Sequence, residues 1–307
     1  MKVAIIIPTR NGGNLWSRTV SSISIQDGYN DNIIIIDSNS SDRTLKDANK
    51  VTGNIIRIHE HEFNHGGTRN LGCRNIDENT DIVIFLTQDA VLASPYSLRN
   101  IVNCFQDTQI AAAFGRQLPH ENASPIAKHA RTFNYSDKSY VSSMASKDSM
   151  GIKTVFISNS FSAYRMSLFN ELGGFPENTI LCEDMYFAAK SILKGYKIAY
   201  VSDAEVYHSH NYSSLEEFRR YFDIGVFHRD EPWIKNAFGG ASGEGSKYII
   251  SELNYLLKES PSFIPIALAN NFMKFLGYKL GGHYSILPMS LRKKFSMHKN
   301  YWNGSER

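Results

Sequence analysis

Three short, β-branched apolar runs, each ending at a polar residue, most constrain what this chain can fold into. They cover residues 2–7, 32–36 and 81–86. Runs without polar alternation are typical of strands that are buried on both faces of a parallel sheet. Apolar residues recur at helical spacing between these runs, which predicts βαβ units and an open α/β sheet.

The same reasoning divides the rest of the chain. We expect helices over residues 15–25, 40–50, 68–76, 97–105, 183–194 and 215–227. We expect further strands over residues 54–58, 110–115, 155–164 and 198–201. Residues 118–153 are polar and irregular, which predicts a mobile loop over the ligand site. Residues 239–245 are typical of a flexible, glycine-rich linker, and a helical, cationic segment follows them.

Polar clusters stand at the carboxyl ends of the three buried strands. They are Pro8-Thr9-Arg10, Asp37 and Thr87-Gln88-Asp89. Open α/β sheets bind their ligands at this edge. We therefore expect the three clusters to converge on one ligand-binding rim.

Composition excludes several classes of protein. Hydrophobic residues make up 42% and charged residues 21% of the 307, a globular mixture that argues against disorder. A net charge of +3 is too small to indicate nucleic-acid binding. The three widely spaced cysteines form no zinc or disulfide pattern, so we expect a reduced, cytoplasmic chain. Polar residues interrupt the nearest approach to a membrane span, residues 263–280.

The C-terminal part of the chain is strongly cationic. From Lys274 onward it carries seven lysines and arginines against one acid, Glu306, with six aromatic residues among them. Basic and aromatic side chains together favour an anionic surface, either phospholipid or a diphosphate-bearing acceptor. This pattern predicts peripheral contact with the inner face of the cell membrane, although a solvated helical face explains it equally well.

Seven motifs follow one another in order: VAIIIPTRN, IIIIDSNSSDRT, FNHGGTRN, FLTQDA, LGGFPE, CEDMYFAAK and YHSHNYS. Together they resemble the family-2 glycosyltransferases of the GT-A fold and, within them, the bacterial rhamnosyltransferases of O-antigen and capsule assembly. The resemblance implies inverting transfer of L-rhamnose from dTDP-L-rhamnose to a hydroxyl of a growing cell-surface polysaccharide, carried on polyprenyl diphosphate. It also implies a GT-A domain over residues 1–238, with a nucleotide-sugar half over 1–115 and an acceptor half over 116–238. A helical, basic extension over 239–307 would follow.

The resemblance assigns donor-binding roles to the rim. Asp37 matches the family's nucleoside-binding aspartate, although an ordinary turn aspartate would suit the serines and asparagine that follow it. Pro8-Thr9-Arg10 would contact the base or diphosphate, with a solvated loop arginine as the alternative for the last residue. Arg69 and Asn70 match donor-contacting positions, in a segment where two glycines and a helix start offer amide donors to an anion.

Thr87-Gln88-Asp89 occupies the place of the family's D-x-D metal motif. Asp89 matches the last aspartate and would hold Mg²⁺ or Mn²⁺ on the diphosphate, while the glutamine would add a carbonyl oxygen. Because a threonine replaces the first aspartate, we expect a weak metal site that the substrate completes. His208 or His210 would fill the shell, since imidazole suits Mn²⁺, although a lone histidine is more often structural.

Glu183-Asp184 matches the family's acidic pair at the start of a helix. The resemblance implies that Asp184 is the general base on the acceptor hydroxyl, opposite the leaving diphosphate, with Glu183 in support. An ordinary acidic helix start would look the same locally. Gly174 and Phe175, in the family's acceptor-side loop, and Trp233 are the expected acceptor contacts, although such aromatic residues are at least as often core.

Two other functions stay open at this point. The donor could be another sugar nucleotide, such as a UDP-hexose, and the incomplete D-x-D motif also allows a catalytically weak sugar-nucleotide-binding protein. A Rossmann oxidoreductase is disfavoured, because the first strand is followed by PTRNGG instead of G-x-G-x-x-G.

Overall fold

A computed structural model describes residues 1–240 and 242–303, which form two compact units. The first consists of Met1–His120, Tyr135–Glu177 and Glu183–His208. The second consists of Glu121–Asn134, Asn178–Cys182 and the described chain from Ser209 onward. The chain therefore passes between the units several times, and each unit is described by itself below.

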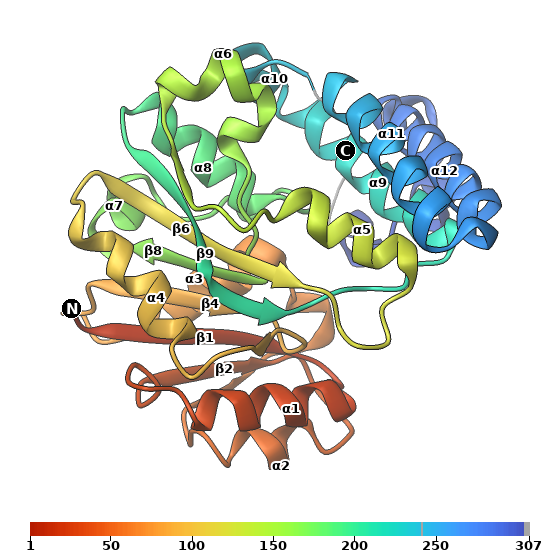
Figure 1. The fold of residues 1–307 in the computed structure, drawn as a ribbon. Coiled ribbons are helices and arrows are strands. Elements are labelled where there is room, and N and C mark those ends of the chain that lie inside the picture. Colours follow the sequence, from red (N-terminus) through yellow and green to blue (C-terminus); the bar gives the residue numbers. More distant parts are fainter. Residues whose placement is uncertain (241, 304–307) are drawn as a thin grey trace. The chain divides into compact units, whose positions relative to one another are not determined.

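The first unit is built on one mixed sheet, drawn as arrows in Figure 1. Its strands are β1 (Val3–Thr9), β2 (Ile33–Asp37), β3 (Ile55–Arg57), β4 (Ile82–Leu86), β5 (Val91–Leu92), β6 (Ile110–Leu118), β7 (Tyr140–Ser142), β8 (Phe161–Arg165) and β9 (Lys197–Tyr207). They lie in the order β3-β2-β1-β4-β8-β6-β9-β5, with β7 paired to β9. The first four are parallel, β8 is antiparallel to both of its neighbours, and β9 is parallel to β6.

Helices cover both faces of this sheet. They are α1 (Gly13–Ser24), α2 (Thr44–Ala48), α3 (His65–Arg74), α4 (Ser97–Asn103), α6 (Lys147–Met150), α7 (Met166–Glu171) and α8 (Glu183–Leu193). On one face, α1 and α4 share a hydrophobic core with alternate residues of the strands, around the fully buried Trp16. On the other face, Phe169 of α7 and Phe187 of α8 pack with Phe85 and Tyr164 of the sheet. Burial of both faces explains the continuous apolar runs of the strands.

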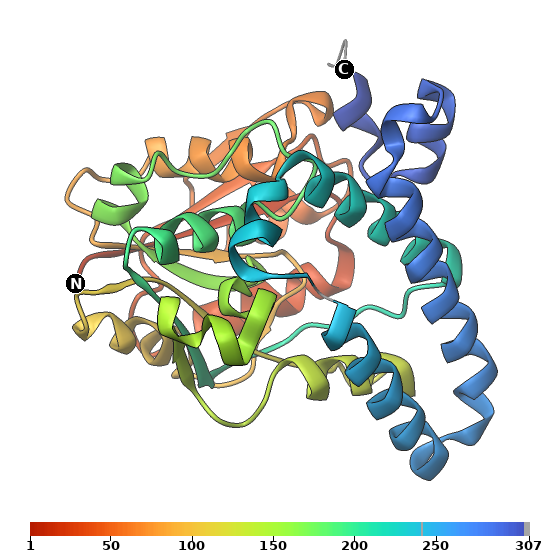
Figure 2. The ribbon, with the colours of Figure 1, turned by 90° about the horizontal axis from the view of Figure 1, so that it is seen from above.

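The second unit is helical. It contains α5 (Pro125–Asn134), α9 (Ser214–Asp230), α10 (Pro232–Phe238), α11 (Ser242–Glu259), α12 (Ile264–Gly282) and α13 (Met289–Phe295). A turn at Pro261–Phe263 joins α11 to α12 as a hairpin (Figure 2). α12 lies directly on α9. The two backbones are so close that a Cβ on Gly277 or Gly281 would overlap the backbone of α9. Within the described residues no helix is both long and apolar enough to cross a membrane.

The structure corrects the expectation of an irregular, mobile loop over residues 118–153. That segment contains α5, the strand β7 and the short helix α6. Ile126, Ala127 and His129 are buried along α5. The helical pattern is therefore present, but it is short and surrounded by polar residues, which is why the segment looks irregular in sequence.

Three expected boundaries also shift. The strand expected over residues 155–164 begins only at Phe161, because a 3-10 turn ends at Val155 and a loop with a further turn occupies residues 156–160. The strand expected over 198–201 extends over Lys197–Tyr207, since it continues along β6 past an irregularity in the pairing. Most of the expected linker over 239–245 is helical, because α11 starts at Ser242, while residue 241 lies outside the described residues.

Candidate active site

Asp37, at the end of β2, is completely buried and holds the turn that follows it. Its Oδ1 accepts hydrogen bonds from the hydroxyls of Thr9, at 3.0 Å, and Ser40, at 2.6 Å. Its Oδ2 accepts the backbone N–H of Ser40 at 2.9 Å. The strand register places Thr9 directly beside Asp37, so two of the expected rim clusters do meet.

The side chain of Gln88 ties the end of β4 to the loop after β1. Its Oε1 accepts the backbone N–H of Arg10 at 2.8 Å, and its Nε2 donates to the carbonyl of Arg10 at 3.0 Å. The amide oxygen that we expected as a metal ligand is therefore hydrogen-bonded to Arg10 in this structure. The Arg10 guanidinium forms a half-exposed ion pair with Glu60 at 2.6 Å. Pro8 lies one residue inside the rim, opposite Ile36 in the register.

The start of α3 is fastened to the loop that contains Gly174 and Phe175. Asn70 reaches that loop twice: its Oδ1 accepts the N–H of Phe175 at 3.0 Å and its Nδ2 donates to the carbonyl of the same residue at 2.9 Å. A Cβ on Gly66 would overlap the carbonyl oxygen of Pro176, so this approach requires glycine. The FNHGGTRN motif thus connects the predicted donor and acceptor sides of the first unit.

The two residues of this loop that we expected to contact the acceptor have structural roles here. Phe175 packs in the core, and Gly174 forms the turn. The Phe175 ring is 2% exposed and packs edge-on or tilted against Phe85 and Tyr164. Gly174 has a φ of +68°, a left-handed conformation that favours glycine. Trp233, the third expected acceptor contact, belongs to α10 in the second unit, where its indole N–H donates to Glu231 at 2.7 Å.

The acidic pair lies in the first turn of α8, and a single asparagine holds both carboxylates. Asn159 donates from Nδ2 to Glu183 Oε1 at 2.7 Å, and its backbone N–H donates to Asp184 Oδ2 at 3.0 Å. Its Oδ1 accepts the hydroxyls of Ser162 and Tyr164, both at 2.8 Å. Asn159 is itself buried, so this network fixes the acidic pair relative to β8.

A buried ion pair joins α8 to α3. Arg69 Nη1 lies 3.1 Å from Glu183 Oε1, and each side chain is only 5% exposed. The same guanidinium donates to the carbonyl of His65 at 3.0 Å and lies over the Phe85 ring, 5.9 Å from its centroid. Arg69, expected at the donor, therefore neutralises the supporting acid of the pair in this structure.

The surroundings of Asp184 make it a good proton acceptor at neutral pH. Burial raises the pKa of Asp184 to about 7, and the negative charge of Glu183 contributes to this rise. The backbone N–H groups of Asn159 and Met185 oppose it by donating to the ionised carboxylate. A carboxyl group that titrates near the working pH is suited to general base catalysis.

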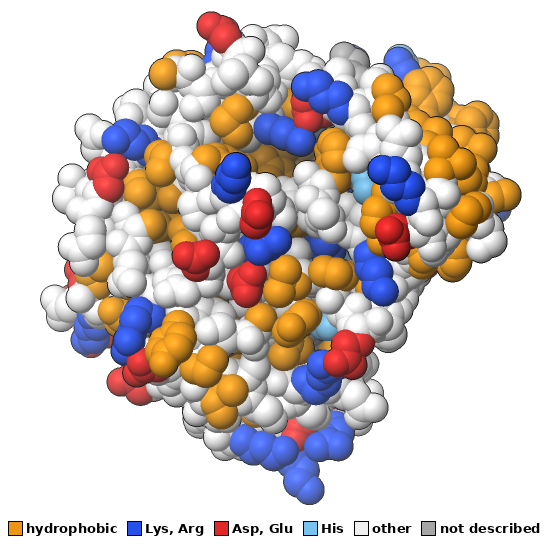
Figure 3. All heavy atoms as spheres, viewed as in Figure 1, with side chains coloured by type: hydrophobic (Ala, Val, Ile, Leu, Met, Phe, Trp, Pro, Cys, Tyr) orange, Lys and Arg blue, Asp and Glu red, His pale blue; other side chains and the backbone are white. Residues whose placement is uncertain are grey.

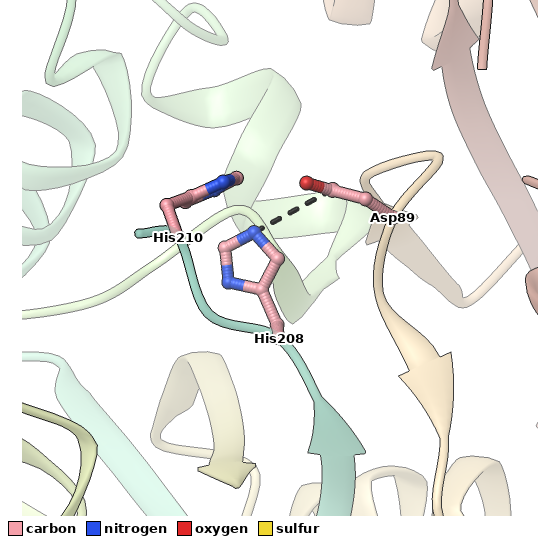
Figure 4. A group of neighbouring side chains, drawn as sticks. All are labelled: Asp89, His208 and His210. Carbon is pink, nitrogen blue, oxygen red and sulfur yellow. Dashed lines mark ion pairs between the residues drawn. The ribbon is translucent and has the colours of Figure 1, made fainter. Parts of the chain in front are cut away.

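A carboxylate and two histidines meet where β4 and β9 end (Figure 4). Asp89 Oδ1 lies 3.5 Å from His208 Nε2, and one ligand atom from each of Asp89, His208 and His210 lies within 4.8 Å of the other two. Gln117 Oε1 lies 2.9 Å from His208 Nδ1, which orients the ring with Nε2 toward Asp89. One carboxylate and two imidazoles fit Mn²⁺ better than Mg²⁺, which prefers oxygen ligands.

Sequence reasoning missed Asn159 and Gln117, which hold the acids and the histidine. Both are polar residues within or beside runs that were assigned to buried strands. A buried amide needs hydrogen-bond partners. Such residues in a strand signal a polar network, although the sequence does not say which groups they meet.

Comparison with known proteins shows the family of this chain. The family model described as "Glycosyl transferase family 2" matches residues 4–173, more than half of the chain. The chain belongs to this family and is an inverting glycosyltransferase, as the order of the seven motifs predicts.

Two of the similar relatives are O-antigen chain rhamnosyltransferases. The chain is 54% identical over 305 residues to the O-antigen chain rhamnosyltransferase RfbN of Salmonella typhimurium, covering 99% of this chain and 96% of the relative. It is 51% identical over 300 residues to the O-antigen chain rhamnosyltransferase WbaN of Salmonella anatum, covering 97% of this chain and 95% of the relative.

Solved structures confirm the GT-A fold. The mannosyltransferase PcManGT from Pyrobaculum calidifontis, solved in complex with GDP-Man and Mn²⁺, matches with a TM-score of 0.57 at 18% identity, over 98% of this chain and 85% of that one. Residues 1–349 of TarS from S. aureus match with a TM-score of 0.54 at 16% identity, over 97% and 84% of the two chains. At this identity the likeness concerns the fold alone.

Proposed function

We propose that this protein transfers L-rhamnose from dTDP-L-rhamnose to a hydroxyl group of a growing O-antigen or similar cell-surface polysaccharide. The observation that carries this proposal is the 54% identity to an O-antigen chain rhamnosyltransferase over 99% of the chain. The arrangement around Asp184 independently supports the proton-transfer step of such a reaction, because it offers one carboxylate with a raised pKa and a second that is neutralised by an arginine.

In the proposed reaction Asp184 accepts the proton of the acceptor hydroxyl as that oxygen attacks the anomeric carbon of the donor sugar. The nucleoside diphosphate leaves from the opposite face, so the anomeric centre is inverted in a single displacement. Asn159 and the N–H of Met185 each hold one oxygen of the carboxylate, which fixes its orientation. Glu183 takes no proton in this scheme: its charge is paired with Arg69, and it raises the basicity of its neighbour.

The proposed donor site is the rim formed by the ends of β1, β2 and β4. Asp37 and Thr9 would meet the nucleoside, Pro8 and Arg10 would line its edge, and Asn70, Arg69 and Gln88 would shape the loops around the diphosphate. Asp89, with His208 and His210, would hold a divalent cation, for which Mn²⁺ is the best match. When bound, that cation would supply positive charge that offsets the charge of the departing diphosphate.

A donor comparison tests the proposal. The purified protein is incubated with Mn²⁺ and an acceptor lipid extract, and nucleoside diphosphate release is followed with dTDP-L-rhamnose, dTDP-D-glucose and UDP-D-glucose. We expect acceptor-dependent release with dTDP-L-rhamnose and background release with the others. Faster release from UDP-D-glucose would replace the proposed donor by a UDP-hexose, and tight donor binding without release would favour a sugar-nucleotide-binding protein.

We also propose that the α11–α12 hairpin lies on the inner face of the cell membrane, where a polyprenyl-diphosphate-linked acceptor would be held, with the body of the protein in the cytoplasm. Apolar side chains gather over these two helices in Figure 3. Leu268, Phe272 and Phe275 of α12 lie on one helix face and are 51%, 62% and 60% exposed. Ile250 and Leu257 of α11 are 62% and 60% exposed.

The glutamates of the hairpin lie in α11, whereas the charge of α12 and the described chain after it favours an anionic bilayer as the partner. Residues 260–303 contain six lysines and arginines and no aspartate or glutamate. A helix that exposes phenylalanine and leucine beside lysine is typical of helices that lie in the membrane interface.

The membrane proposal is tested by sedimentation with phosphatidylglycerol vesicles. The double variant Phe272→Asp/Phe275→Asp should stay in the supernatant, whereas the control Tyr96→Asp, at a position that is 52% exposed in the first unit, should sediment like the unchanged protein. Equal sedimentation of the double variant, or loss of self-association instead of vesicle binding, would contradict a membrane role for this surface.

A further inference from the structure

The second unit contains a pocket that none of the proposed base, donor or metal residues lines. Its volume is about 330 Å³, at the lower end of the usual range for ligand pockets, about 300–1,000 Å³. Its walls are Asn178–Ile180, the end of α9 with Glu231, and Tyr284 from the turn after α12. Three separate stretches of the chain therefore meet around one cavity.

The lining favours a neutral, hydroxyl-rich molecule. Asp230 and Glu231 contribute two carboxylates, Asn178 contributes an amide, and Tyr284 contributes an aromatic ring. The described residues that line the pocket include neither lysine nor arginine, and the nearby Arg292 guanidinium is engaged over the Tyr284 ring, 5.3 Å from its centroid. A nucleoside diphosphate or a lipid diphosphate would therefore meet like charge there, whereas sugar hydroxyls donate to carboxylates and sugar ring faces pack on aromatic rings.

The polar groups of the pocket are held in place by their neighbours. The Tyr284 hydroxyl donates to Asp230 Oδ1 at 2.8 Å, and the Trp233 indole N–H donates to Glu231 Oε2 at 2.7 Å. Trp302 packs edge-on against Tyr284, with ring centroids 5.4 Å apart. A carboxylate has about four acceptor sites, so each can accept sugar hydroxyls beside these bonds. Groups that are already oriented bind a ligand with a smaller loss of entropy.

The chain itself connects this pocket to the acidic pair. The wall Asn178–Ile180 is followed, after Leu181 and Cys182, by Glu183 and Asp184 at the start of α8. Cys182 has a φ of +59°, in the left-handed region that non-glycine residues rarely adopt. A ligand in this pocket therefore contacts residues that lie only a few positions before the proposed base in the sequence.

We propose that this pocket binds a neutral sugar residue of the acceptor glycan, at a position other than the sugar that carries the reacting hydroxyl. The proposal rests on the proposed glycosyl transfer and adds the part of the acceptor that the protein recognises. Asp230 and Glu231 accept hydrogen bonds from its hydroxyls, and Tyr284 packs against its ring. The pocket is thus a specificity site of the acceptor side, made of residues that take no part in the chemical step.

The test uses the full chain and the methyl glycosides of D-galactose, D-glucose, D-mannose and L-rhamnose, with an excess of dTDP to fill the donor site. Saturation-transfer NMR reports which glycoside binds. We expect at least one glycoside to bind to the unchanged protein. Its affinity should be about fivefold lower in Glu231→Gln, because a charge-assisted hydrogen bond becomes a neutral hydrogen bond. Tyr284→Ala should abolish the signal. The exposed positions Glu78→Gln and Tyr96→Ala serve as matched controls and should leave it unchanged.

Two results would overturn the proposal: no glycoside gives a signal with the unchanged protein, or the signal persists equally in Glu231→Gln and Tyr284→Ala. Thermal melting of each variant separates loss of binding from loss of folding, and Tyr284→Phe, which keeps the ring, should retain most of the signal. Binding without rhamnose transfer would refute the proposed function and leave the pocket standing. Transfer whose acceptor KM is unchanged in Glu231→Gln would refute the pocket alone.

Discussion

Replacing Arg69 by methionine should destabilise the first unit strongly, because it leaves the charge of Glu183 buried without its partner. The two side chains lie 3.1 Å apart and are each 5% exposed, so solvent screens the pair very little. Breaking such a pair by removing one member costs about 3–5 kcal/mol. Methionine has a similar length and apolar character, so little of this cost comes from an empty cavity.

The expected fall in melting temperature follows from this cost. One kcal/mol corresponds to about 2–4 °C for domains of 150–250 residues, which gives a fall of roughly 10 °C for Arg69→Met. The matched control is Arg74→Met on the same helix, whose pair with Glu177 has side chains that are 60% and 55% exposed. Such an exposed pair contributes about 0–1 kcal/mol, so this variant should melt close to the unchanged protein.

A double-mutant cycle measured by urea unfolding, followed by circular dichroism, isolates the interaction. Glu183→Gln keeps an oxygen for Asn159 and removes the charge, so Arg69→Met/Glu183→Gln should recover about 1–3 kcal/mol relative to the sum of the single variants. If Arg69→Met costs less than about 1 kcal/mol, or if the two changes are additive, the buried pair does not hold α3 to α8 as argued.

Four further predictions follow from the site. The rate of sugar transfer should fall about tenfold per pH unit below about pH 7, because burial raises the pKa of Asp184 to about 7 and the base must be ionised. The same raised pKa means that the folded state keeps a proton that the unfolded chain loses near 3.8, so the stability contributed by Asp184 should be lost as pH rises from about 4 to about 7, and the difference in urea unfolding between the unchanged protein and Asp184→Asn should vary with pH over this range. Gly66→Ala should cost about 1–3 kcal/mol in urea unfolding, because its Cβ overlaps the carbonyl oxygen of Pro176, and a cost near zero would mean that α3 and the loop can separate. Asp89→Ala should weaken Mn²⁺ binding measured by electron paramagnetic resonance in the presence of dTDP, and unchanged affinity would remove Asp89 from the metal site.

Much of the sheet could be predicted from the sequence, because strands that are buried on both faces must be apolar throughout. The runs at residues 2–7, 32–36 and 81–86 correspond to β1, β2 and β4 within one or two residues. Their parallel register then brings Thr9 beside Asp37 without further information. The antiparallel insertion of β8 between β4 and β6 has no such local signature, since it depends on which strand ends up beside which.

The partners of the polar residues could not be predicted, because they are far apart in the chain. Arg69 was expected at the donor, and the structure pairs it with Glu183, 114 positions later. Gln88 was expected to offer its oxygen to a metal, and it binds the backbone of Arg10 instead. A motif shows which residue types gather at a site, whereas packing decides which of them meet.

The central claim is that Asp184 is the base for sugar transfer, and one assay tests it most directly. Transfer of radiolabelled rhamnose from dTDP-L-rhamnose to acceptor lipid is measured for the unchanged protein, for Asp184→Asn and for the exposed control Asp203→Asn, with dTDP affinity measured alongside by calorimetry. We predict that Asp184→Asn lowers the transfer rate by about 10²–10⁴ while dTDP affinity and the control stay unchanged. Transfer by Asp184→Asn within about threefold of the unchanged protein would contradict the account, since a neutral amide cannot take the proton.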